Sequence, residues 1–156
     1  CTLHRAENTE DPKRINGIFS ALAEISDTID VVLPLHPRTR KILAAFGHRL
    51  DYPRVHMVDP VGYLHMIWLL QNCTFVMTDS GGLQKEAYFF QKPCVTLRNE
   101  TEWVELVEAG WNMLAGAEAQ QILDAVQSMK NRKIGQGELY GAGNSADIIL
   151  RELLHL

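Results

Sequence analysis

The chain has 156 residues, of which 46% are hydrophobic and 22% charged, and 15 Lys and Arg against 19 Asp and Glu give a net charge of −4. This composition is typical of one globular domain, and a mildly acidic chain without a basic stripe argues against general nucleic-acid binding. The three cysteines form no CxxC pair, which argues against a disulfide framework or a zinc ribbon. No apolar run reaches the length of a membrane span and no signal peptide is visible, so we expect a cytoplasmic protein. The chain starts at Cys1 within what resembles the end of a strand, so we expect a piece of a longer protein.

Short runs rich in Val, Thr and Leu alternate along the chain with longer runs of helical periodicity. The predicted strands are residues 30–35, 55–58, 74–78, 93–97 and 112–115. The predicted helices are residues 12–26, 38–46, 63–71, 83–90, 102–109, 119–130 and 145–154, and residues 131–144, with four glycines, form a predicted loop. This alternation favours an α/β fold in which a doubly wound parallel sheet of about five or six strands has helices on both faces, a Rossmann-like arrangement.

Local signals support several of these boundaries. Asp11 precedes Pro12, which is the pattern of an N-cap followed by proline at the first helical position. Gly110 is suited to close a helix. The apolar residues 68–70 indicate core packing.

Polar residues follow the predicted strands at several points. Ligands of open α/β sheets collect beyond the carboxyl ends of the strands, so these residues are the candidates for a site. They are His4 and Arg5 with Glu7 and Asn8, residues 36–38, Asp59 and Pro60, residues 79–82, and residues 98–105.

The run TDSGGLQKEA (residues 78–87) carries the strongest of these patterns. A strand is expected to end before Ser80, and Gly81 and Gly82 lead into a helix whose free N–H groups attract anions. A diphosphate fits this turn, and Glu86, about one turn further, can accept from a ribose hydroxyl pair. An ordinary strand–helix turn with a solvated glutamate explains the same pattern, whereas Ser80 is not the centre of the GxSxG motif of serine hydrolases.

The other clusters have two interpretations each. The imidazole of His4 can exchange protons or sit against a phosphate, or it can lie in a solvated loop, while Glu7 and Asn8 are expected to cap the next helix. His36 precedes three cations, which favours either a bound anion or a basic first turn without a ligand. After Arg98, Thr101 is a plausible N-cap, and the carboxylates behind it either serve the helix dipole or bind sugar hydroxyls. The carboxylates are those of Glu102 and Glu105.

Six motifs occur in one order along the chain: HRAEN, LHPRTR, DPVGYLHMIWLL, TDSGGLQKEA, RNETEWVE and YGAGNSA. Together they resemble the C-terminal half of the non-hydrolysing UDP-N-acetylglucosamine 2-epimerases, and the resemblance covers essentially all of residues 1–156. Members of that family place two Rossmann-like domains across a cleft, the GT-B arrangement, and bind the nucleotide mainly through the C-terminal domain. The resemblance therefore implies that residues 1–156 are the C-terminal UDP-binding domain, with the N-terminal domain absent from the chain.

The reaction implied by the resemblance interconverts UDP-GlcNAc and UDP-ManNAc by elimination and re-addition of UDP. It needs no metal and no other cofactor, and the implied partners are the UDP-sugar, the missing N-terminal domain and a second copy in a homodimer. Because the family's acidic catalytic residues lie mostly in the N-terminal domain, the isolated domain is expected to be inactive. An epimerase of UDP-2,3-diacetamido-glucuronate and the nucleotide-binding half of a GT-B glycosyltransferase are the alternatives.

The resemblance also implies a role for each site residue. His4 matches a catalytic histidine, Ser80, Gly81 and Gly82 match the diphosphate loop, and Glu86 matches the carboxylate on the ribose. The remaining matches are Met66 beside the uracil, Arg98, Thr101 and Glu102 in a loop that closes on the nucleotide, and Arg5 and His36 around a second, allosteric UDP-GlcNAc. Many members read TERPE where this chain reads TEWVE, so Trp103 replaces an arginine that would meet the diphosphate, which leaves the sugar open.

Overall fold

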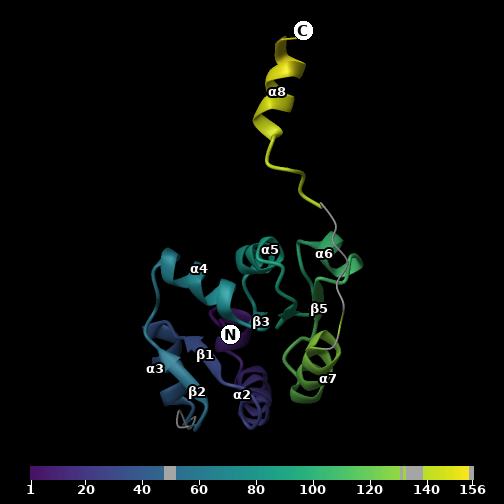
Figure 1. Ribbon diagram of the computed structural model, residues 1–156. Helices are drawn as coiled ribbons and strands as arrows, with labels where there is room; N and C mark the ends of the chain where they lie inside the picture. The colour runs from purple at the N-terminus through teal and green to yellow at the C-terminus, as the bar shows by residue number, and fades with distance from the viewer. Residues whose placement is uncertain (48–51, 131, 133–138, 155–156) are drawn as a thin grey trace.

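Short parallel strands and the helices that connect them make up the fold (Figure 1). The computed structural model describes residues 1–47, 52–130, 132 and 139–154. In chain order the elements are α1 (Ala6–Thr9), α2 (Pro12–Ser26), β1 (Val31–Pro34), α3 (Pro37–Ala45), β2 (Val55–Val58), α4 (Tyr63–Asn72), β3 (Val76–Thr78), α5 (Gly81–Phe89), β4 (Cys94–Thr96), α6 (Val104–Glu108), β5 (Asn112–Leu114), α7 (Ala119–Lys130) and α8 (Ser145–Leu154). Of the predicted loop, residues 131 and 133–138 lie outside the described residues.

Every strand pair among the described residues is parallel. β1 pairs with β2, and β4 pairs with β3 on one side and with β5 on the other. Residues 1–3 join the two sheets, because the Cys1 nitrogen donates to the Val32 carbonyl at 2.8 Å and the Thr2 N–H donates to the Met77 carbonyl at 2.9 Å. The spatial order is therefore β2, β1, residues 1–3, β3, β4, β5, which is the order of a doubly wound sheet.

Helices cover both faces of the strands. Figure 1 shows α2 and α7 side by side below the strands and α4 and α5 above them. The larger core lies on the side of α2 and α7, where Phe19, Leu33 and Ile122 are almost completely buried. A smaller cluster around Leu70 and Ala87 packs α4 and α5 against the other face. The predicted Rossmann-like α/β fold is confirmed.

Helix α2 forms for the local reasons that its sequence indicates. The Asp11 side chain accepts from the backbone N–H groups of Lys13 and Arg14, and Pro12 occupies the first helical position, so the predicted N-cap is confirmed. Its buried residues recur at spacings of three and four and face the core. The large apolar ones among them are Ile15, Ile18, Phe19, Leu22 and Ile25.

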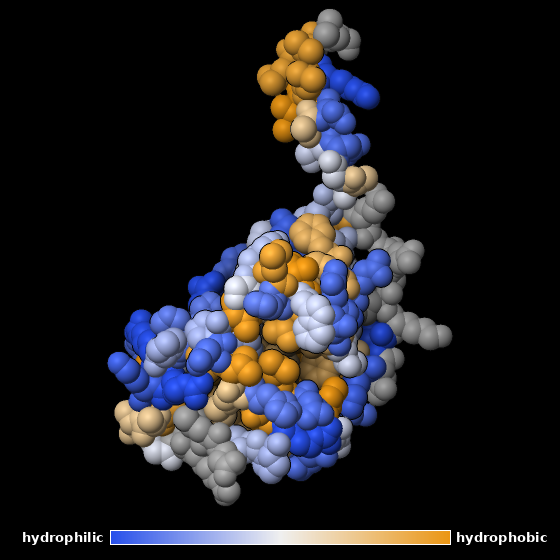
Figure 2. Space-filling model, turned by 60° about the vertical axis from the view of Figure 1, so that its left-hand side comes forward, coloured by the Kyte–Doolittle hydropathy of each residue, from blue (hydrophilic) through white to orange (hydrophobic). Residues whose placement is uncertain are grey.

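Two expectations about the helices are wrong. Trp68 is 61% exposed, and Leu70 is the one buried residue of α4. The helix carries apolar residues on all its sides, but only one side contacts the sheet. Helix α6 begins at Val104 instead of Glu102, and Gly110 with φ of +79° follows its end as predicted. Helix α8 is exposed throughout, and Figure 2 shows its apolar residues gathered along one side.

None of the described helices combines the length and the apolar character that crossing a bilayer requires.

Gly17 lies where α2 approaches the segment before α7. A Cβ added to Gly17 would stand 2.2 Å from the backbone oxygen of Ala117. Alanine improves helix propensity by about 1 kcal/mol, but a main-chain oxygen at this distance cannot move aside cheaply. We expect Gly17→Ala to lower the free energy of unfolding by about 1–3 kcal/mol in urea denaturation. Ser20→Ala, an exposed site of the same helix, is the control and should change it by less than about 0.5 kcal/mol; equal stabilities for the two variants would contradict this packing.

Candidate functional site

The site lies where residues 1–3 and β3 run side by side. The chain leaves residues 1–3 toward α2 and leaves β3 toward α5, and these two helices cover opposite faces of the sheet (Figure 1). Crevices of open α/β sheets form at such a switch point, at the carboxyl ends of the strands. Thr2 and Thr78 mark this end with hydroxyl oxygens 2.6 Å apart. His4 and Ser80 follow directly, so the first and the fourth of the predicted clusters meet here.

A buried carboxylate, Asp79, connects these two clusters. Asp79 is fully buried and accepts from the backbone N–H groups of His4, at 3.1 and 3.2 Å, and Arg5, at 2.9 Å. The Nδ1 atom of His4 also lies 3.2 Å from Oδ1 of Asp79, while the His4 side chain remains 52% exposed. Asp79, to which the sequence assigned no role, thus holds the predicted catalytic histidine at the carboxyl edge of the sheet.

Asn8 completes the surroundings of Asp79. Its side-chain amide donates to Oδ2 of Asp79 at 3.2 Å and to the carbonyl of Leu97 at 2.9 Å, and its Oδ1 accepts from Nε of Arg14 at 3.0 Å. Asn8 is fully buried and lies in α1, a short helix that was not predicted from the sequence. The expectation that it caps the next helix is wrong, because Asp11 takes that position and the Asn8 amide is used by the buried carboxylate.

The N-terminus of α5 opens onto the same edge. Ser80 is the N-cap, with its hydroxyl 3.5 Å from the Leu83 nitrogen, and its own N–H donates to Thr78 Oγ1. Helix α5 begins at Gly81 instead of Leu83, so both glycines lie in its first turn. Gly82 is exposed, and the N–H groups of Gly81 and Gly82 meet no acceptor among the described residues. Such N–H groups at a helix N-terminus attract anions.

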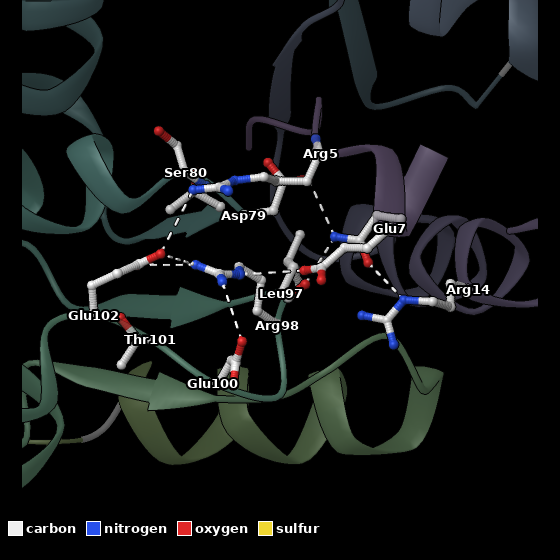
Figure 3. A network of polar contacts seen from close by, with 12 residues as sticks. Arg5, Glu7, Arg14, Asp79, Ser80, Leu97, Arg98, Glu100, Thr101 and Glu102 are labelled. Atoms are coloured by element: carbon white, nitrogen blue, oxygen red, sulfur yellow. Dashed lines mark hydrogen bonds and ion pairs between the residues drawn. The ribbon is translucent and has the colours of Figure 1, made fainter. Parts of the chain in front are cut away.

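Arg98 follows β4 and is surrounded by carboxylates (Figure 3). Its Nη1 donates to both oxygens of Glu102 at 2.9 and 3.0 Å, its Nε donates to Glu7 at 3.3 Å, and Nη2 lies 3.9 Å from Glu100. The hydrogen bonds and charge of Glu102, and after it the charge and hydrogen bond of Glu7, raise the pKa of Arg98. The pKa of Glu102 is lowered, first by its own backbone N–H and then by Arg98. Glu7 is therefore an ion-pair partner of Arg98 instead of a helix cap.

Thr101 ties this loop to α5. Its hydroxyl donates to Oε1 of the buried Gln84 at 2.6 Å and accepts from the Trp103 N–H at 3.1 Å. The same Gln84 oxygen accepts from Nδ2 of Asn112 at 3.0 Å. The predicted N-cap role of Thr101 is wrong, because α6 begins three residues later at Val104.

Trp103 packs over the first turn of α5. Its indole N–H donates to the carbonyl of Gly81 at 2.7 Å, and the ammonium of Lys85 lies 4.4 Å from the ring of Trp103 and 4.1 Å from the ring of Tyr140. The Tyr140 hydroxyl donates to Glu105 at 2.8 Å. Trp103, at the position where many members of the family have an arginine, is thus bonded to the first turn of α5 through a neutral hydrogen bond.

The remaining predicted residues lie around this centre. Glu86 is half-buried on α5, and Met66 of α4 lines, together with Leu83, an apolar cavity of about 380 Å³. Arg5 places Nη2 3.8 Å from Glu102. His36 caps α3 at another strand end, where its Nδ1 accepts from the Arg38 N–H at 3.2 Å. Their contacts with UDP or with an allosteric ligand stay predictions. Among the described residues, no group of three His, Cys, Asp or Glu side chains could hold a metal ion.

Comparison with known proteins identifies the family. The family model for UDP-N-acetylglucosamine 2-epimerase matches residues 1–154. The chain is 52% identical to the UDP-2,3-diacetamido-2,3-dideoxy-D-glucuronate 2-epimerase of Pseudomonas aeruginosa, over 99% of this chain and 44% of that protein. The UDP-GlcNAc 2-epimerase of Methanocaldococcus jannaschii superposes with a TM-score of 0.91 at 36% identity, over 99% of this chain and 45% of that one. Its complex with UDP-GlcNAc and UDP gives 0.87 at 37% identity, with 99% and 44% covered. The chain thus spans less than half the length of these relatives.

Thr101 provides a test of how the loop is fixed. Thr101→Val keeps the shape of the side chain but removes the hydroxyl that bonds Gln84 and the Trp103 N–H. We expect the free energy of unfolding to fall by about 1–2 kcal/mol, measured by urea denaturation, because two hydrogen bonds are lost. Thr101→Ser keeps the hydroxyl and is the matched control, with a smaller loss. If valine is tolerated as well as serine, these two bonds do not hold the loop.

Proposed function

The chain belongs to the UDP-N-acetylglucosamine 2-epimerase family, and on this premise we propose that it is the UDP-sugar-binding half of a nucleotide-sugar 2-epimerase. The proposal depends on one juxtaposition: the half-exposed His4 and the open N-terminus of α5 are held at the same edge of the sheet by Asp79 and Ser80. A group that can exchange protons thereby stands beside a site suited to a diphosphate.

In the proposed complex, the diphosphate of UDP binds the N–H groups of Gly81 and Gly82. Glu86 lies further along α5, where its carboxylate accepts from the ribose hydroxyls, and Met66 borders the uracil. Arg98, Thr101 and Glu102 form the loop over the nucleotide. The Glu102 carboxylate already stands 3.1 Å from where a Gly81 Cβ would lie, so a bound diphosphate must share this space with it.

The proposed reaction is an elimination followed by an addition. The proton at C2 of the sugar is removed and the bond from C1 to the UDP oxygen breaks, which leaves UDP and a 2-acetamidoglucal. A proton then returns to C2 on the opposite face and the UDP oxygen bonds to C1 again. We propose that His4 takes part in these proton transfers while the α5 N-terminus stabilises the departing diphosphate.

UDP-GlcNAc is the proposed substrate, and one observation favours a second candidate. The P. aeruginosa relative with 52% identity is named for UDP-2,3-diacetamido-2,3-dideoxy-D-glucuronate, and the M. jannaschii relative with 36% identity for UDP-GlcNAc. Trp103 packs on the first turn of α5 and Lys85 of α5 lies over its ring, so these two residues are candidates to determine which sugar is preferred. A GT-B glycosyltransferase is less favoured, because the family and the relatives named above are epimerases.

We further propose that the active enzyme contains an N-terminal half that faces this domain across a cleft, acts as a homodimer in the cytoplasm and requires no cofactor. The relatives are more than twice as long as the part that this chain matches, which supports a second half. Residues 1–156 alone are then expected to bind UDP and not to turn over substrate. Arg5 and His36 stay candidates for an allosteric site.

Glu86 tests the proposed nucleotide site. We expect Glu86→Ala to weaken UDP binding by about 2 kcal/mol, because a charged hydrogen-bond pair with the ribose is lost. The measurement is titration calorimetry with UDP. The matched control is Glu24→Ala, at an exposed position of α2 on the opposite face of the sheet, and it should leave the affinity unchanged. Ser80→Ala should cost about 1 kcal/mol through the loss of one neutral bond. Equal UDP affinity of Glu86→Ala and wild type would contradict the proposed site.

Substrate choice is tested with the intact enzyme. UDP-GlcNAc and UDP-2,3-diacetamido-glucuronate are incubated separately without any acceptor, and proton NMR in D₂O follows the C2 epimer and deuterium at C2. We expect epimerisation with solvent deuterium incorporated, and no product when residues 1–156 are used alone. If neither sugar yields a C2 epimer, the epimerase proposal is refuted. Turnover by residues 1–156 alone would refute the need for the second half.

A further inference from the structure

We infer that Asp79 is a positioning residue, which holds His4 in the tautomer with the proton on Nδ1 and leaves Nε2 as the atom that exchanges protons with the substrate. The inference rests on the proposed function, because it assigns the working atom of the proposed catalytic residue. Asp79 itself is buried beneath His4 and does not touch substrate.

The geometry separates the two ring nitrogens of His4. Nδ1 lies 3.2 Å from Oδ1 of Asp79, which is fully buried, whereas Nε2 has no partner among the described residues and the side chain is 52% exposed. An ionised carboxylate only accepts hydrogen bonds, so the nitrogen beside it must carry the proton. In a neutral imidazole the other nitrogen then has the free lone pair.

The carboxylate is held in one orientation by its other partners. The His4 N–H bonds both of its oxygens, and Oδ2 also accepts from the Arg5 N–H and from the Asn8 amide. The side-chain amide of Asn8 cannot rotate by 180° without losing its hydrogen bonds to Leu97 and Arg14. Rotation of the Asp79 carboxylate would therefore break several bonds at once. Of the two side chains that contact the carboxylate, Asn8 is buried and His4 is exposed, so the His4 ring is the one that can adjust.

A purely structural role is the alternative. Asp79 also ties the segment after residues 1–3 to the end of β3, and its loss would lower stability whether or not it directs His4. A scaffold requires only that the main-chain N–H groups be bonded. A positioning role requires in addition that the carboxylate determine the tautomer and the rate of the chemical step.

The test uses the intact protein with ¹⁵N-labelled histidine and the C2 epimerisation assay. In the wild type, the ¹⁵N shifts of His4 above its titration range are expected to show Nδ1 protonated. In Asp79→Asn, we expect the protonated nitrogen to change to Nε2 and kcat to fall by about 100-fold or more, the scale of a misdirected general acid–base group, while KM stays within about threefold. Glu10→Gln, which removes one charge from the exposed partner of Arg38, is the matched control with an unchanged tautomer.

Two results would overturn the inference: a wild-type His4 protonated on Nε2, or a folded Asp79→Asn variant with wild-type kcat. If Asp79→Asn does not fold, the wild-type spectrum alone decides the tautomer, and Asn8→Ala, which leaves the carboxylate on His4, should retain Nδ1 protonation. If the intact protein epimerises no UDP-sugar while His4 is protonated on Nδ1, the proposed function fails and the Asp79–His4 geometry stands.

Discussion

The buried Asp79 carboxylate is the interaction on which the site depends. Residues 1–3 enter the sheet through few main-chain bonds, notably those from Cys1 to Val32 and from Thr2 to Met77. Beyond them the parallel bonding ends, and Asp79 binds the next two N–H groups in place of a neighbouring strand. Removing one partner of a buried charge is strongly destabilising, so this turn has little freedom. The position of His4 at the carboxyl edge of the sheet follows from this constraint.

The positive groups near His4 differ in whether they are already paired. Arg98 is nearly buried and its guanidinium is shared among Glu7, Glu100 and Glu102, so its charge is already compensated. The N–H groups of Gly81 and Gly82 at the start of α5 are neutral and meet no acceptor among the described residues, although Gly81 is buried. The proposed diphosphate would therefore find uncompensated dipoles at the start of α5, and would gain Arg98 only by competing with carboxylates. Trp103 strengthens this arrangement, because it bonds the Gly81 carbonyl without adding a charge.

Much of the fold could be predicted because its signals are local. The Asp11 cap, the proline after it and the three-and-four spacing of α2 depend only on neighbours in the chain. Errors arose where an apolar helix is buried on one side only and where residues expected to cap a helix bind distant partners instead. Trp68 lies in an apolar helix of which one side meets the sheet, and Thr101 bonds Gln84 of another helix instead of capping its own. No short-range pattern distinguishes these cases.

The sequence by itself determined the alternation of strands and helices, the doubly wound sheet and the polar clusters at its carboxyl edge, because periodicity and turn residues act over a few positions. The resemblance to the family added expected roles for His4, Ser80 and Glu86. Only the tertiary structure decided which clusters meet, and it assigned Asp79 and Asn8 their roles. Asp79 lies 75 residues from His4 in the chain, and the contact exists because the sheet places residues 1–3 beside β3. A buried carboxylate selects its donors through space, which no spacing along the chain encodes.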